Sequence, residues 1–159
     1  MAIKERWKGF AELPPDIELR LADLPALLKE HGVQLAYLFG SLSSARQGRD
    51  PEANDVDLAV WSSESPVYRL RAPIVECLGT ERVDLVDLER ASPVLRFEIL
   101  KTGHPLYVAD EAFQQRYEMQ TLRVYRDTHH LRRQQRECLR ERFAQWSSNR
   151  RPSLFDSKS

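Results

Sequence analysis

The stretch from position 35 to position 60 restricts the possible folds of this chain more than any other part of it. An apolar run over residues 35–39 is typical of a buried strand and ends at Gly40 and Ser41. After a polar loop, alternating residues predict a second strand that carries Asp55 and Asp57 on one face and aliphatic side chains on the other. The aliphatic face suits a core, so the two carboxylates lie side by side on the opposite face.

Two carboxylates held this closely repel each other unless a cation lies between them. Because the ligands of this pair are all oxygens, the fitting cation is hard and divalent, either Mg²⁺ or Mn²⁺. Gly40 and Ser41 offer the other half of such a site. A glycine lets the backbone approach a phosphate closely, and the serine hydroxyl and the N–H groups of a following helix turn donate to the phosphate oxygens.

The order of strand, Gly-Ser, loop and Asp-x-Asp resembles the DNA polymerase beta-type nucleotidyltransferase superfamily. Within it, the chain is similar to the minimal nucleotidyltransferases, the MntA-type antitoxins encoded beside HEPN-domain toxins. A downstream stretch over residues 83–107 is similar to the same family, so the resemblance covers roughly the middle half of the chain. The matching motif residues are Gly40, Ser41, Asp55, Val56, Asp57 and Leu58.

A third candidate carboxylate lies on a strand predicted over residues 83–88. Asp84 sits between apolar neighbours, where a carboxylate is costly unless it is paired or binds a metal. The resemblance implies that Asp84 is the third carboxylate of the site, which either shares a second metal ion or acts as general base for the acceptor hydroxyl. Asp87 lies on the other face, and we expect it to be a strand-end or capping residue.

Two arginines in the loop are candidate phosphate ligands. Residues 45–48 resemble the small-Arg-Gly pattern that family members carry soon after Gly-Ser. Arg46 or Arg49 is therefore a candidate to contact the triphosphate or to stabilise the leaving pyrophosphate. For each of these two arginines, a side chain that only faces solvent is an equal alternative.

The remaining pattern predicts a single small α/β domain. We expect a small mixed sheet with helices packed on one face, the carboxylates on the other, and a long C-terminal helix. The expected elements include a helix over 16–31 divided at Pro25, a helix over 66–78, a helix from Ser92–Pro93 to Gly103 and an edge strand over 105–108. The expected regions are an N-terminal extension (1–15), a nucleotidyltransferase core (16–110), a C-terminal helical region (111–150) and a disordered tail (151–159).

Composition limits the classes of protein to consider. With 159 residues, 42% of them hydrophobic, the chain suits one domain with a core. Its net charge of zero gives no general attraction to nucleic acid, which we do not expect as direct substrate. The sequence shows neither a membrane-spanning run nor a signal region, so we expect a cytoplasmic protein without membrane contact. Cys77 and Cys138 are expected to be reduced thiols.

The C-terminal region is rich in arginine and has no proline or glycine from Glu111 to about Ser147. Such a charge asymmetry predicts an acidic partner surface or nucleic acid as a binding partner. A solvated helix face, on which Glu137 and Glu141 are local ion partners, is an equal alternative. The arginines are Arg123, Arg126, Arg132, Arg133, Arg136, Arg140, Arg142, Arg150 and Arg151.

The resemblance implies a Mg²⁺-dependent enzyme that moves AMP from ATP to a tyrosine hydroxyl of a HEPN-type ribonuclease toxin and so acts as its antitoxin. A charged and bulky phosphate would obstruct an RNA-binding site on the toxin. Two alternatives stay open. One is transfer of AMP to a small molecule such as an aminoglycoside, and the other is a non-catalytic module that neutralises the toxin by contact through the arginine-rich helix.

Overall fold

The computed structural model describes residue 7, residues 9–46 and residues 53–149. Two compact units make up the chain, Met1–Leu122 and Arg123–Ser159. In the described part, no helix is both long enough and apolar enough to cross a membrane. The tail predicted over 151–159 lies outside the described residues.

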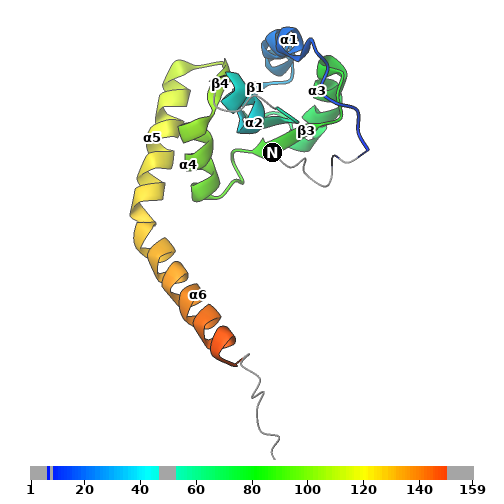
Figure 1. Ribbon diagram of the computed structural model, residues 1–159. Coiled ribbons are helices and arrows are strands. Elements are labelled where there is room, and N and C mark those ends of the chain that lie inside the picture. Colours follow the sequence, from blue (N-terminus) through cyan, green and yellow to red (C-terminus); the bar gives the residue numbers. More distant parts are fainter. Residues whose placement is uncertain (1–6, 8, 47–52, 150–159) are drawn as a thin grey trace, which may run out of the picture. The chain divides into compact units, whose positions relative to one another are not determined.

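The first unit is built on a four-stranded sheet in the order β3-β2-β1-β4 (Figure 1). β1 (Val33–Phe39) pairs antiparallel with both β2 (Val56–Ser62) and β4 (His104–Val108). β2 pairs parallel with β3 (Val83–Asp87), so the sheet is mixed, as the sequence predicts. β4, which contains a proline, is an edge strand as expected.

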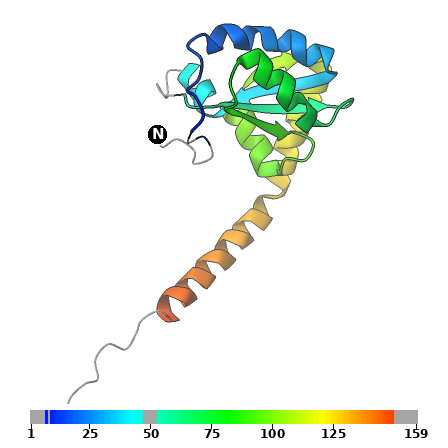
Figure 2. The same ribbon diagram turned by 90° about the vertical axis from the view of Figure 1, so that its right-hand side faces the viewer.

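One face of the sheet is covered by α1 (Ile17–Glu30) and α3 (Arg71–Leu78) (Figure 2). Aliphatic side chains of both helices pack against those of the strands in one buried cluster. Leu24, Leu58 and Ile74 represent α1, β2 and α3 in it and are completely buried. Burial of this aliphatic face is what the alternation along β2 predicts.

Helices also cover part of the opposite face, which corrects the expectation of a single helix layer. α4 (Pro93–Thr102) contributes Ile99 and α5 (Glu111–Asp127) contributes Tyr117 to a second cluster around Tyr37 of β1. Both helices have an apolar side that requires a core of its own, and the α1–α3 face is already filled. The carboxylates lie on this second face, as expected.

Two prolines are tolerated inside the helices that cover the first face. The division expected at Pro25 is wrong, because α1 is continuous through this residue. The buried leucines before and after it, Leu24 and Leu28, hold both halves of α1 against the sheet and outweigh the missing hydrogen bond. The segment over 66–78 is a 3₁₀ turn, η2 (Val67–Leu70), followed by α3, in which Pro73 occupies the first turn.

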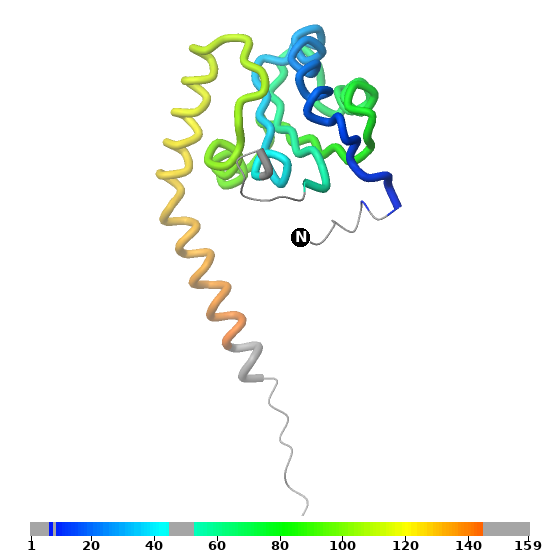
Figure 3. Tube along the Cα trace, turned by 45° about the horizontal axis from the view of Figure 1, so that its top comes forward, coloured from blue at the N-terminus to red at the C-terminus, as the bar shows by residue number. Residues whose placement is uncertain are grey.

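The helix predicted to begin at Ser92 is present with the expected cap. The hydroxyl of Ser92 accepts a hydrogen bond from the backbone N–H of Leu95 at 3.2 Å, and α4 ends before Gly103. At its C-terminal end, α4 lies beside α2 (Gly40–Arg46) (Figure 3). There Ser43 donates to the carbonyl oxygen of Thr102 at 3.2 Å, which fixes the short helix that follows β1.

Gly40 joins β1 to α2 and lies directly against a carboxylate. Its φ of +71° is in the left-handed region, where a side chain is strained. A Cβ atom on this residue would lie 2.0 Å from Oδ2 of Asp57. The backbone therefore approaches Asp57 as closely as it does because position 40 has no side chain.

The second unit contains α6 (His129–Asn149), which is separated from α5 by Thr128. The hydroxyl of Thr128 donates to the carbonyl oxygen of Val124 at 2.8 Å, a bond that competes with regular helix geometry. Local pairs support the helix, with the Arg132 guanidinium 3.8 Å from the centre of the Tyr125 ring. Over residues 129–144 of α6, whose side chains are described, large apolar side chains are exposed at Leu131, Leu139 and Phe143.

Cys77 and Cys138 are both free thiols, as the sequence predicts. Burial raises the pKa of the Cys77 thiol above its usual value, so this side chain stays protonated at neutral pH.

Replacing Gly40 by alanine should destabilise the first unit and displace Asp57. A side chain in the left-handed region costs about 1–3 kcal/mol, and the overlap with the carboxylate adds to that cost. Thermal unfolding of Gly40→Ala beside Gly9→Ala separates the two effects, since Gly9 has a φ of +97° but a Cβ atom added there would meet no other atom within 4 Å. Equal losses in the two variants would contradict the close contact.

Replacing Tyr37 by phenylalanine should lower the free energy of unfolding by about 1.5–3 kcal/mol at pH 7. The Tyr37 hydroxyl donates to Oε1 of Glu118 at 2.6 Å and ties β1 to α5. Burial, followed by the Glu118 carboxylate, raises the pKa of Tyr37 well above its usual value. The bond therefore contributes fully below the unfolded-state pKa of about 10 and progressively less above it. Urea unfolding should show the difference at pH 7 and a smaller one at about pH 10.5, and a constant difference would contradict this account.

Candidate functional site

Asp57 and Asp84 lie next to each other on neighbouring strands. They are partners in the parallel register of β2 and β3. The residues flanking Asp84, Val83 and Leu85, pack with the α1–α3 cluster, whereas Val86 packs with the opposite one. Because side chains alternate along a strand, Asp84 shares the face of Asp57.

Asp55 precedes β2 and is held by two donors. The hydroxyl of Ser41 donates to Oδ1 of Asp55 at 3.0 Å, and the indole N–H of Trp7 donates to Oδ2 at 3.0 Å. Only 3% of Asp55 and 6% of Asp57 is exposed. Burial of carboxylates is costly unless donors or cations compensate it, so this corner of the sheet is built to hold negative charge.

The carboxylate oxygens at this corner of the sheet suit a cation whose coordination shell is completed by other ligands. Among the described residues, no three His, Cys, Asp or Glu side chains are close enough together to hold a metal ion by themselves. Mg²⁺ in proteins is commonly bound by one or two carboxylates, with water and substrate phosphates as the other ligands. Asp55 and Asp57, the two carboxylates at the start of β2, fit that mode, whereas Asp84 on β3 does not complete a cluster of three ligands with them in the described part of the chain.

The two loop arginines predicted as phosphate ligands are at the limit of the described chain. Arg46 is the last residue of α2, and its side chain lies outside the described part. Arg49 lies within 47–52, also outside the described residues. Their contact with a triphosphate stays a prediction.

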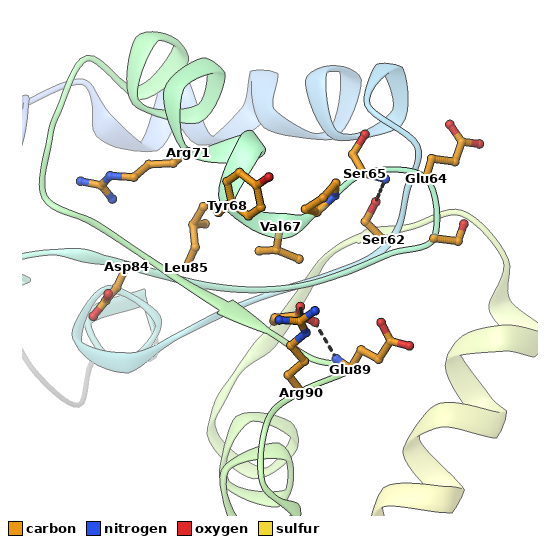
Figure 4. A pocket seen from close by; sticks show the side chains of 13 residues that line it. Ser62, Glu64, Ser65, Val67, Tyr68, Arg71, Asp84, Leu85, Glu89 and Arg90 are labelled. Atoms are coloured by element: carbon orange, nitrogen blue, oxygen red, sulfur yellow. Dashed lines mark hydrogen bonds and ion pairs between the residues drawn. The ribbon is translucent and has the colours of Figure 1, made fainter.

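A groove of about 720 Å³ runs along the outer edge of β3 and includes Asp84 (Figure 4). Tyr68 of η2, Arg71 of α3 and Arg90 line it together with Asp84, and Figure 4 shows these side chains on both sides of the strand. Arg71 donates to the carbonyl oxygen of Glu81 at 3.0 Å and so covers the beginning of this edge. A second molecule in the groove would reach Asp84 from the side away from β1.

Sequence reasoning did not identify the residues that support Asp55. Trp7 is 48 positions away from Asp55, and no periodic pattern links two side chains so far apart. Arg82 is 4% exposed, and its guanidinium donates to the carbonyl oxygens of Phe10 at 2.7 Å and Asn54 at 3.2 Å. The available signal is the pair of aromatic residues Trp7 and Phe10, which the sequence offers as side chains that dock on the body of the domain without specifying where.

A curated relative from Shewanella oneidensis is similar to part of this chain. The protein adenylyltransferase MntA of Shewanella oneidensis is 35% identical to the chain over 79 residues. The match covers 47% of this chain and 54% of that protein, so the chain spans about half the length of the relative.

Two solved structures have a similar fold over most of their length. The tri-AMPylated Shewanella oneidensis HEPN toxin in complex with MNT antitoxin includes a chain with a TM-score of 0.59 and 25% identity, over 80% of this chain and 98% of that chain. A toxin-antitoxin structure with AMP-PNP gives a TM-score of 0.61 and 26% identity, over 77% of this chain and 98% of that chain.

The family model described as polymerase beta, nucleotidyltransferase matches residues 23–112. This range is more than half of the chain and contains every candidate site residue that the sequence predicts. The chain therefore belongs to the polymerase beta nucleotidyltransferase family.

Proposed function

We propose that this chain is a nucleotidyltransferase that moves AMP from ATP to a tyrosine hydroxyl of a HEPN-type toxin and thereby acts as the antitoxin. One observation carries the proposal: Asp57 and Asp84 are register partners on β2 and β3, beside a Gly-Ser turn that contacts Asp55 and Asp57. Such an arrangement can neutralise a triphosphate and position an attacking hydroxyl on one face of the sheet.

The comparisons support the substrate and the partner in this proposal. The relative from Shewanella oneidensis is a protein adenylyltransferase, and one structural neighbour is a complex with a tri-AMPylated HEPN toxin. Another neighbour was solved with AMP-PNP, an ATP analogue. Adenine itself is proposed on this likeness alone, because no described residue selects the base. Because the proposed reaction consumes ATP and uses Mg²⁺, we propose that it takes place in the cytoplasm.

Each residue has a defined task in the proposed reaction. Gly40 and Ser41 hold the β- and γ-phosphates, and Asp55 and Asp57 would supply the carboxylate oxygens for Mg²⁺ or Mn²⁺. When bound, the metal would neutralise phosphate charge and lower the pKa of the acceptor hydroxyl. That hydroxyl oxygen bonds to the α-phosphorus while the bond to pyrophosphate breaks.

The proposed reaction also releases a proton and pyrophosphate, and residues of the chain are assigned to each. Asp84, at the end of the β3 groove, accepts the proton from the attacking hydroxyl. The leaving pyrophosphate carries negative charge, which Arg46 or Arg49 is placed in sequence to neutralise. The acceptor enters along the groove and brings most of its own binding surface.

The decisive experiment is intact-mass spectrometry of the product of the adjacent gene, which is the candidate toxin. Incubation with the wild-type chain, ATP and Mg²⁺ should add one or more AMP units to the toxin. The double variant Asp55→Asn/Asp57→Asn should add none, because it removes two of the proposed metal ligands. Unfolding midpoints of the variant and the wild type verify that both are folded.

Two other outcomes would contradict the proposal in different ways. A toxin that is bound and silenced without any gain of mass would indicate neutralisation by contact alone. A toxin that stays unmodified and active, with AMP transferred to an aminoglycoside instead, would indicate a small-molecule enzyme.

Replacement of Asp84 by asparagine should slow AMP transfer by about 10²-fold or more, the usual range for loss of a general base. Asp87→Asn is the matched control on the same strand, because Asp87 lies on the other face and accepts a hydrogen bond from the N–H of Glu89 at 2.9 Å. Single-turnover rates at saturating ATP and Mg²⁺ measure the difference. Similar rates in the two variants would remove Asp84 from the proposed mechanism.

A further inference from the structure

Trp7, which belongs to the described part of the N-terminal segment (residues 7 and 9–15), forms part of the candidate site. Trp7 is 5% exposed, and its indole N–H donates to Oδ2 of Asp55 at 3.0 Å. The other oxygen of the same carboxylate accepts from the hydroxyl of Ser41 at 3.0 Å. Two donors from different parts of the chain thus fix the carboxylate group of Asp55 in one orientation.

A buried arginine anchors this segment beside the site. The guanidinium of Arg82 donates to the carbonyl oxygen of Phe10 at 2.7 Å and to that of Asn54, the residue before Asp55, at 3.2 Å. One side chain thus connects the N-terminal segment to the start of β2. Phe10 in turn contacts Trp7, because its N–H donates to the carbonyl oxygen of Trp7 and the two rings meet edge to face at 5.8 Å.

A donor on a carboxylate oxygen does not prevent that carboxylate from binding a cation. Each carboxylate oxygen has two lone-pair directions, so an oxygen that accepts an indole N–H can also bind a cation. Carboxylates that bind metals are commonly oriented by such hydrogen bonds, and loss of the outer donor typically weakens metal binding about 10- to 100-fold. The contact between Trp7 and Asp55 has this form.

We infer that Trp7 is a positioning residue that fixes Asp55 for the divalent cation of the site. The inference rests on the proposed function, since it assigns Asp55 to the metal. The opposite role is inhibitory: the indole N–H occupies the position that the cation requires and acts as a plug of the metal site. The two roles predict opposite effects when the N–H is removed and the ring is kept.

Trp7→Phe removes the N–H and keeps an aromatic ring against Phe10. The probe is Mn²⁺ together with the α,β-methylene analogue of ATP, which cannot transfer AMP. The loss of the free Mn²⁺ signal in electron paramagnetic resonance then measures binding without catalysis. We expect the Mn²⁺ dissociation constant to rise about tenfold or more in Trp7→Phe. At saturating Mn²⁺, the rate of AMP transfer to the toxin should return close to that of the wild type.

Trp61→Phe is the matched control, because it also removes one indole N–H. The Trp61 ring packs against Phe113 at 4.7 Å, in the cluster beneath α5. Its Mn²⁺ affinity should equal that of the wild type. If Trp7→Phe does not fold, β-(3-benzothienyl)alanine at position 7 keeps the shape of the indole and lacks the N–H.

Each outcome decides a different question. Mn²⁺ binding by Trp7→Phe at wild-type affinity would overturn the positioning role, and tighter binding would replace it with the plug. A wild-type chain that binds no Mn²⁺ with the nucleotide analogue would overturn the proposed function together with this inference. Wild-type binding that Asp55→Asn/Asp57→Asn abolishes, and that Trp7→Phe weakens, would support both.

Discussion

The burial of Asp55 and Asp57 at the start of β2 is the constraint on which the rest of this site depends. A buried carboxylate is costly, and two neighbouring ones add mutual repulsion. Their surroundings reduce this cost: Ser41 and Trp7 donate to Asp55, and the absence of a side chain at Gly40 leaves room for Asp57. A cation and a phosphate-bearing ligand would offset the remaining charge, and the same features would then serve binding and stability together.

The sequence was sufficient to predict the parts of the site that depend on local spacing. Alternation along a strand places Asp57 on the face opposite the core, and the same rule separates Asp84 from Asp87 on β3. Register between β2 and β3 is a different matter, since it depends on how two segments far apart in the chain align. The structure supplies it by pairing Asp57 with Asp84.

Features that depend on competition between distant contacts were not predictable. An apolar side on α4 indicates that the helix is buried, but not which face of the sheet it covers. Pro25 weakens α1 locally, and only packing against the sheet shows that the helix continues. The hydrogen bond from Trp7 to Asp55 joins an N-terminal segment to a strand, and neither segment has a pattern that specifies the other.

An open groove and a metal site that lacks a third protein ligand in the described part of the chain have the same consequence for the proposed reaction. Because no three potential ligand side chains gather among the described residues, a cation would bind firmly only when nucleotide phosphates complete its shell. Because the groove at Asp84 is open along the edge of β3, the acceptor of the proposed reaction would likewise complete the site from outside. Metal, nucleotide and acceptor would then assemble together, and activity would depend on the correct partner protein being present. An antitoxin that modifies one toxin requires that kind of specificity.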